Sequence, residues 1–147
     1  AGAAVNNSGY AYFTTDLAGN SSYGPALPAG QLVTYPFSGQ VKVATSFSSN
    51  NESPDPVPNQ DVVGYPISVH ANYGAVLNVA TFSVRQRGSA TDLSVRLLRS
   101  DSDAHTPVSA AAIIPLAPLT AATTYDVSFI GKVNGANLTR NWSFTTR

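Results

Sequence analysis

The stretch TYDVSFIGKVNGANLTRNWSFTT, residues 124–146, decides the fold class of this chain. In both of its halves, aromatic or branched apolar residues alternate with polar ones, which is the period of a strand with one buried face. Asn134-Gly135 lies between the halves and is a strong signal for a two-residue hairpin turn. The stretch therefore predicts a β-hairpin that turns Tyr125 and Trp142 toward a core.

Similar alternation recurs upstream in short segments separated by Gly, Pro, Asn and Ser. The strand candidates are 10–15, 31–35, 41–47, 65–72, 80–85, 93–98 and the apolar run 110–116. On two of them the side chains expected to share one face are Val41, Val43, Thr45 and Phe47, and then Ala80, Phe82 and Val84. Many short strands at regular spacing, with no helical period, predict an all-β fold, an antiparallel β-sandwich of about seven to nine strands.

The length of 147 residues suits a single compact domain. Within it we expect an N-terminal extension, residues 1–34, with one or two short strands, and the sandwich itself at residues 35–147. Eight basic and eight acidic side chains give a net charge of zero. This balance argues against nucleic acid, which is normally met by a basic stripe, and no apolar run is long enough for a transmembrane segment.

The compartment is suggested by composition. The chain has no cysteine and no methionine, and it begins Ala1-Gly2-Ala3-Ala4, like the residues around a signal-peptide cleavage site. It is rich in Ser, Thr, Asn, Gly and Ala. We expect an exported bacterial protein in the periplasm, on the outer surface or secreted, and a lipoprotein if an acylated cysteine lies upstream. The alternative is a fragment of another protein freed from a tag.

The segment 118–129 resembles the tyrosine corner of fibronectin type III and bacterial immunoglobulin-like domains. Leu119, Thr123 and Tyr125 match its pattern, whereas Ala121-Ala122 stands where the pattern has Pro-Gly. The resemblance implies an immunoglobulin-like sandwich in which Leu119, Tyr125 and Trp142 are structural residues. It also implies that the Tyr125 hydroxyl bonds to backbone between Leu119 and Ala121.

Two further segments extend this resemblance. Trp-Ser-Phe-Thr-Thr at 142–146 is similar to the end of bacterial immunoglobulin-like domains, and residues 35–41 are similar to their opening Pro-x-x-Gly segment. With the Glu-x-Pro-x-Pro loop at 52–56 and the segment 64–69, the chain also resembles the β-domain that accompanies CAP-type (cysteine-rich secretory protein-like) domains in bacterial exported proteins. The CAP histidine and glutamate signature is missing, so no CAP function is implied.

The longest irregular stretch, residues 48–61, holds three prolines within five residues, which excludes a helix and a central strand. Its Glu52, the only glutamate, and Asp55 can do acid–base work if they are held about 5–9.5 Å apart. Alternatively the loop is solvated, or Glu52 turns inward to satisfy loop amides. We expect a partner to bind this loop together with an N-terminal segment that carries Tyr10, Tyr12 and Tyr23, and not the arginine-bearing strands.

Three other groups of polar residues are candidate sites. Asp101, Asp103 and His105 alternate and would share one side of an extended chain, as a weak metal candidate; the alternative is a polar turn. His70 lies on the polar side of a predicted strand. Four arginines are expected to decorate one exposed sheet face and keep it soluble: Arg85, Arg87, Arg96 and Arg99.

No nucleophile elbow and no dense ligand set accompanies these residues. The favoured function is therefore a noncatalytic accessory, adhesion or interaction domain, which is also a candidate surface antigen. We expect a monomer without a cofactor. Its partner is expected to be an unknown protein or glycan at the cell surface. The alternative is a carbohydrate-binding module that uses exposed tyrosines, among them Tyr35, Tyr65 and Tyr73. A hydrolase or a metal-binding protein is the remote alternative.

Overall fold

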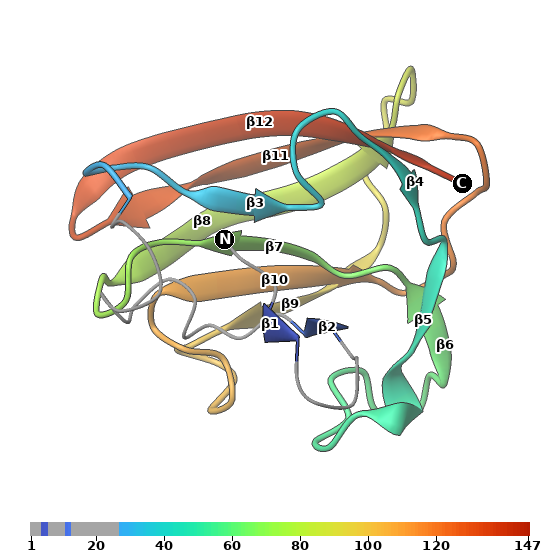
Figure 1. Ribbon diagram of the computed structural model, residues 1–147, viewed down its shortest axis with the longest axis horizontal. Coiled ribbons are helices and arrows are strands. Elements are labelled where there is room, and N and C mark those ends of the chain that lie inside the picture. Colours follow the sequence, from blue (N-terminus) through green and yellow to red (C-terminus); the bar gives the residue numbers. More distant parts are fainter. Residues whose placement is uncertain (1–3, 6–10, 13–26) are drawn as a thin grey trace.

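The computed structural model describes residues 4–5, 11–12 and 27–147. No α-helix occurs in this part of the chain (Figure 1). The strands are β1 (Ala4–Val5), β2 (Ala11–Tyr12), β3 (Val33–Tyr35), β4 (Gln40–Val43), β5 (Ser46–Ser48), β6 (Val62–Gly64), β7 (Ile67–His70), β8 (Leu77–Gln86), β9 (Val95–Arg99), β10 (Ala110–Pro115), β11 (Thr124–Val133) and β12 (Ala136–Thr146). With strands and no α-helix over the described residues, the predicted all-β class is confirmed.

Two four-stranded sheets form the two layers of a sandwich (Figure 1). One has the order β3-β7-β10-β9, and the other, which we call the hairpin sheet, has the order β4-β12-β11-β8. Their facing sides are apolar and bury the aromatic and branched residues of both sheets. The largest of these core side chains include Phe82, Trp142, Phe129, Phe144, Ile67 and Ile113. The eight strands of the two layers agree with the predicted seven to nine.

The hairpin predicted from residues 124–146 is confirmed. Strands β11 and β12 pair antiparallel from Thr124↔Thr145 to Val133↔Ala136. The turn residues Asn134 and Gly135 both have positive φ, 49° and 83°, which is the backbone that the Asn-Gly pair adopts most easily. Tyr125 and its alternate neighbours on β11 point into the core, as the alternation indicates.

The single strand predicted over 41–47 is wrong, because two strands of different sheets occupy it. Lys42 has φ 58°, and β4 advances three residues, Gln40 to Val43, while β12 advances two. This bulge leaves Val41 63% exposed and Val43 only 3% exposed, so the two do not share a face. Strand β4 also runs parallel to β12, which makes one pair of the sandwich parallel.

A second bulge overturns the expectation that Ala80 points inward. The register between β8 and β11 shifts at Ile130/Gly131, so that Gly131 pairs with Val79 and Ile130 with Thr81. Ala80 is the extra residue on β8 and is exposed, whereas Phe82 and Val84 are buried as predicted. Period-two alternation fails at a bulge because the added residue shifts the phase by one.

The loop of residues 49–61 is closed by the β5–β6 ribbon and packs on the first sheet. Its beginning forms one 3₁₀ turn, η2 (Ser49–Asn51), so the expectation of no helix is wrong for the residues that precede the prolines. Val57 and Val63 bury against Ile114 of β10 in a small second core. The hydroxyl of Ser49, which is fully buried, donates to the Gln60 carbonyl at 2.7 Å.

The sandwich begins before the expected boundary at residue 35. Strand β3 pairs with β7 from Val33 onward, and Leu32 is part of the main core. Leu27 and Asn72 exchange two hydrogen bonds of 2.8 Å, from the Leu27 N–H and from the Asn72 amide. Nothing in the described part of the chain forms a helix long and apolar enough to cross a membrane.

Candidate functional site: a polar groove on the hairpin sheet

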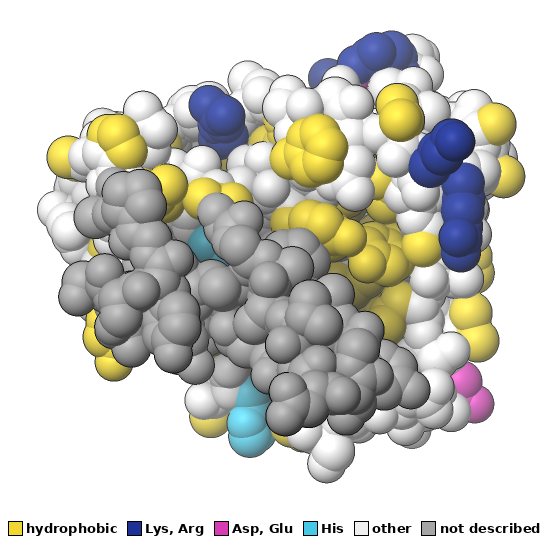
Figure 2. Space-filling model, in the orientation of Figure 1, with side chains coloured by type: hydrophobic (Ala, Val, Ile, Leu, Met, Phe, Trp, Pro, Cys, Tyr) yellow, Lys and Arg dark blue, Asp and Glu magenta, His cyan; other side chains and the backbone are white. Residues whose placement is uncertain are grey.

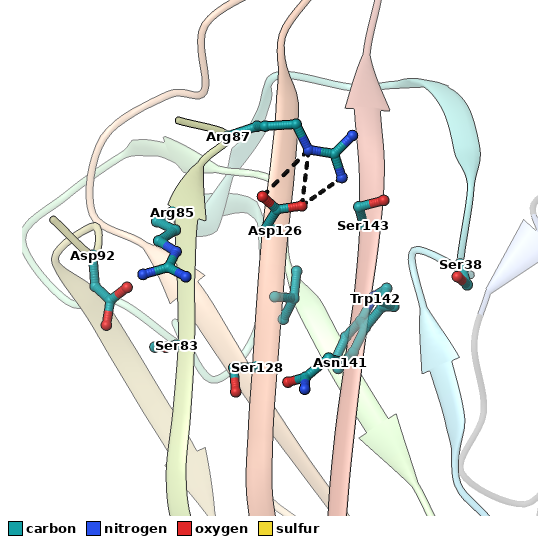
Figure 3. A pocket seen from close by; sticks show the side chains of 11 residues that line it. Ser38, Ser83, Arg85, Arg87, Asp92, Asp126, Ser128, Asn141, Trp142 and Ser143 are labelled. Carbon is teal, nitrogen blue, oxygen red and sulfur yellow. Dashed lines mark hydrogen bonds and ion pairs between the residues drawn. The ribbon is translucent and has the colours of Figure 1, made fainter. Parts of the chain in front are cut away.

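A groove of about 620 Å³ runs over the outer face of the hairpin sheet (Figure 3). We call it the outer groove. It is bordered by the β3–β4 turn on one side and by the β8–β9 connection on the other. Its lining is mostly polar and comprises Ser38, Ser83, Arg85, Arg87, Asp92, Asp126, Val127, Ser128, Asn141, Trp142 and Ser143.

The register of three strands arranges this lining in two rows. In one row Asp126 of β11 stands between Arg85 of β8 and Ser143 of β12. In the next row Ser128 stands between Ser83 and Asn141, so each strand contributes alternate residues. Neighbouring strands of a sheet lie about 4.8 Å apart, and alternate residues of one strand are roughly 7 Å apart, so these spacings separate the backbone positions within a row and between the rows. Hydroxyl, amide, carboxylate and guanidinium groups thus form a regular lattice of hydrogen-bonding groups.

One ion pair is held within the groove. The Arg87 guanidinium donates to Asp126, with Nη2–Oδ1 at 2.5 Å and Nε at 3.1 and 3.3 Å from the two carboxylate oxygens (Figure 3). These hydrogen bonds and the negative charge of Asp126 raise the pKa of Arg87. The Asp126 carboxylate is therefore paired with Arg87, although the strand register places Asp126 opposite Arg85.

Arg85 is exposed and makes no ion pair or hydrogen bond with any residue that the structure describes. Figure 3 shows its guanidinium beside Asp92 of the β8–β9 connection, with no interaction drawn between them. A guanidinium offers five N–H donors in a fixed fork. Arg85 is thus the cation of the groove whose hydrogen-bonding capacity is available to a ligand.

A second, more apolar groove of about 440 Å³ lies on the same sheet at the β8–β11 bulge. Its lining includes Val79, Ile130 and Leu138, and Ile130 is 45% exposed. Glu52 and Asp55 line neither of the two grooves. Sequence patterning singles out none of the Ser and Asn residues of the outer groove, because each is an ordinary polar position of its own strand.

The loop carboxylates are placed apart from both grooves. Glu52 is exposed, so the alternative in which it turns inward is wrong; its backbone N–H caps η2 by donating to the Ser49 carbonyl. Asp55 Oδ1 accepts the Val57 N–H at 2.9 Å. The Ser49 hydroxyl donates to a loop carbonyl and Asp55 accepts from a loop N–H, because short polar side chains bond readily to nearby backbone groups.

The expectation of an extended Asp101–His105 segment is wrong, and the alternative of a polar turn is confirmed. The Asp101 carboxylate accepts from Arg99 Nε at 2.8 Å. The Asp103 carboxylate accepts from the Thr106 hydroxyl and the His105 N–H, and the Thr106 bond contributes most to lowering the pKa of Asp103. Within the described residues no group of three or more His, Cys, Asp or Glu side chains is placed to hold a metal ion.

Of the tyrosines expected to bind a partner or a glycan, the structure describes the side chains of Tyr35, Tyr65 and Tyr73. Tyr10 and Tyr23 lie outside the described residues, as does the side chain of Tyr12. Tyr35 and Tyr65 pair through their hydroxyls at 3.0 Å, with ring centroids 6.0 Å apart, and both are half-buried. Tyr73 is 69% exposed. Figure 2 shows hydrophobic side chains at the surface near β3 and β5.

The structural residues lie as the resemblance implies. Leu119, Tyr125 and Trp142 are buried, and the Thr120 N–H donates to the Tyr125 hydroxyl at 2.8 Å, which confirms the predicted bond. The indole N–H of Trp142 is the one buried side-chain polar atom in the described chain that lacks a hydrogen-bond partner. The sequence does not indicate that this N–H lacks a partner.

The remaining candidates divide between the sheets. Arg85 and Arg87 extend from β8 and its end in the hairpin sheet, whereas Arg96 and Arg99 belong to β9 in the other sheet, so the expectation of one arginine face is wrong. His70 is half-buried and its Nε2 lies 3.0 Å from the Ser68 hydroxyl. Burial lowers the pKa of His70.

Comparisons with known proteins find no matching family model, no matching curated protein and no matching solved structure.

Proposed function

We propose that this chain is a noncatalytic interaction domain of an exported bacterial protein, and that its ligand binds in the outer groove. The observation that carries the proposal is the lattice of polar groups on Arg85–Asp126–Ser143 and its neighbouring row. These groups stand on three strands of a hydrogen-bonded sheet. A rigid scaffold of this kind presents binding groups with little loss of conformational entropy.

The architecture supports the immunoglobulin-like assignment. When β3, β7, β10 and β9 are labelled A, B, E and D, and β8, β11 and β12 are labelled C, F and G, the strand order is that of immunoglobulin-type sandwiches. The Tyr125 corner occupies its usual place near the start of strand F. Such folds host many functions, so the fold supports the class of scaffold and the groove supports the binding role.

The noncatalytic part of the proposal is supported by how the acidic residues are used. Asp55, Asp101 and Asp103 each accept a hydrogen bond or an ion pair within their own turn. The export part is supported by the high content of Ser, Thr, Asn, Gly and Ala and by the presence of only two lysines, Lys42 and Lys132. Cell fractionation after expression of the complete gene tests export directly.

Binding is tested with immobilised cell-envelope material from a bacterium that carries the gene. We expect saturable binding of the labelled chain that the unlabelled chain competes. Ser128→Trp fills the centre of the groove and should abolish binding, because Ser128 lies midway between Ser83 and Asn141. Glu52→Arg reverses the one exposed glutamate of the 49–61 loop and should leave binding unchanged.

The reverse pattern, with loss of binding in Glu52→Arg only, would place the interface on the loop instead. Turnover of any envelope component by the chain would contradict the noncatalytic assignment. Both substituted positions lie outside the core, so we expect both variants to fold. Thermal unfolding of the two variants checks this.

A further inference from the structure

We propose that the outer groove binds an acidic polysaccharide, with a sugar carboxylate held by Arg85. This inference rests on the proposed function and names its class of ligand. Of the two arginines that line the groove, Arg87 is paired with Asp126, whereas the exposed Arg85 makes no hydrogen bond or ion pair with Asp126, with Asp92 or with any other residue that the structure describes. Guanidinium and carboxylate fit as a bidentate pair, which is stronger than a neutral hydrogen bond.

The rest of the lining matches the hydroxyl groups of a sugar chain. Ser83, Ser128 and Ser143 each can donate and accept, and the Asn141 amide can do both. Sugar hydroxyls also both donate and accept, so rows of such groups complement one another. The Arg87–Asp126 pair adds donors and acceptors whose positions are fixed by three hydrogen bonds.

The location of the groove disfavours an extended acidic peptide. Peptides that bind β-sheets usually add to an edge, where unpaired backbone groups are available. The outer groove lies on a sheet face, centred on β11, and the backbone of β11 is paired with β12 on one side and with β8 on the other. A ligand in this groove is thus recognised by side chains, which suits a sugar chain better.

The β3–β4 turn, which borders the groove at Ser38, also carries an exposed aromatic residue. This turn contributes Ser38 to the groove, and the neighbouring Phe37 is 59% exposed. The Gly39 N–H donates to the Ser143 carbonyl at 2.8 Å, which fixes the turn against β12. Aromatic rings pack on the apolar faces of sugar rings, so a sugar chain that extends past Ser38 would find in Phe37 a contact that does not depend on charge.

The test is a titration of the 147-residue chain with an oligogalacturonate, whose every ring carries a carboxylate. Matched probes are a neutral galactose oligomer of the same length and a poly-glutamate peptide. Arg85→Ala should weaken oligogalacturonate binding at least about tenfold, because a charge-assisted hydrogen bond is lost. Arg96→Ala removes the same charge from the other sheet and should leave binding unchanged. Added salt should weaken binding to the wild type.

The proposal is overturned if the oligogalacturonate does not bind, if Arg85→Ala binds it as the wild type does, or if the neutral oligomer binds equally well. Binding of poly-glutamate in preference to the oligogalacturonate also overturns it, in favour of an acidic protein partner. The proposed function is tested by a different experiment, namely whether Ser128→Trp abolishes binding to envelope material. Failure of the oligogalacturonate titration therefore overturns the acidic-polysaccharide proposal alone.

Discussion

Tyr125 joins the core to the segment that precedes its strand. Its ring is 2% exposed and stacks on Phe144 with centroids 5.6 Å apart, while its hydroxyl accepts the Thr120 N–H. The tyrosine therefore anchors the 118–123 segment without any need for the Pro-Gly that usually shapes this turn. Ala122 has a φ of 49°, in the left-handed region. Glycine adopts this backbone conformation easily, whereas alanine disfavours it.

Tyr125→Phe should destabilise the fold by about 0.5–1.5 kcal/mol, the net value of a hydrogen bond, because the ring stays and only the acceptor of the Thr120 N–H is lost. Urea unfolding measures this difference. Tyr73→Phe removes a hydroxyl from a ring that is 69% exposed and should cost almost nothing. Equal effects of the two variants would mean that the tyrosine corner does not stabilise this sandwich.

Tyr65 gives the stability of the protein a dependence on alkaline pH. Burial, then the hydrogen bond and the proximity of Tyr35, raise the pKa of Tyr65 from 10.0 to about 12. The folded state holds this proton more tightly than the unfolded chain does. The contribution to stability is therefore complete below pH 10 and is lost as the pH rises through about 12.

Unfolding midpoints measured from pH 9 to pH 12 should fall more steeply for the wild type than for Tyr65→Phe, which cannot ionise at this position. The two proteins differ only at residue 65, so the difference between their curves reports on the Tyr65 hydroxyl. Parallel curves for the two proteins would contradict the raised pKa.

At the scale of elements, the two bulges decide what each sheet presents to solvent. The β8–β11 bulge exposes Ala80 and Ile130 next to the apolar groove, and the β4 bulge exposes Val41. Gly131 allows the first bulge, because a Cβ at this position would lie 2.2 Å from the Asn78 carbonyl oxygen and 2.7 Å from the Phe129 ring. The close approach of β8 to β11 thus depends on the missing side chain.

Gly131→Ala should lower the free energy of unfolding by more than about 2 kcal/mol, because backbone must move to relieve the contact. Gly88→Ala is a suitable comparison, since a Cβ there meets nothing within 4 Å and only the φ of 85° is strained. That strain costs roughly 1–2 kcal/mol. A smaller loss for Gly131→Ala than for Gly88→Ala in denaturant unfolding would show that the bulge can shift freely.

At the scale of the whole molecule, stability comes from two apolar cores of unequal size. The main core lies between the sheets, and the second lies under the 49–61 loop, where Val57, Val63 and Ile114 meet. The long loop is thereby part of the packed structure. Its prolines and Asp55 shape it, and the buried Ser49 hydroxyl closes it.

We expect the thermal stability of the chain to be independent of divalent metal. The Asp101 carboxylate pairs with Arg99, and the Asp103 carboxylate accepts from the Thr106 hydroxyl and the His105 N–H, so both carboxylates already have partners within the turn. Melting with and without EDTA should differ by less than the roughly 2–4 °C that 1 kcal/mol produces in a domain of this size. A larger drop with EDTA would make this turn a metal site.

Sequence alone determines the class of fold, because period-two alternation and turn residues are local properties. The hairpin at 124–146, its Asn134-Gly135 turn and the corner at Tyr125 are all encoded within a few neighbouring positions. Where a bulge adds a residue, as at Ala80 and Lys42, the same local rule assigns the wrong face, since the bulge depends on the partner strand.

The outer groove is decided by tertiary structure. Arg85, Asp126 and Ser143 are unremarkable polar positions of three strands, and only the registers of β8, β11 and β12 bring them into one row. Whether Asp126 neutralises Arg85 or Arg87 depends on side-chain geometry at the end of β8, where Arg87 forms the ion pair. Register is set by long-range pairing and by the packing of the whole sheet, so no local pattern of residues contains it.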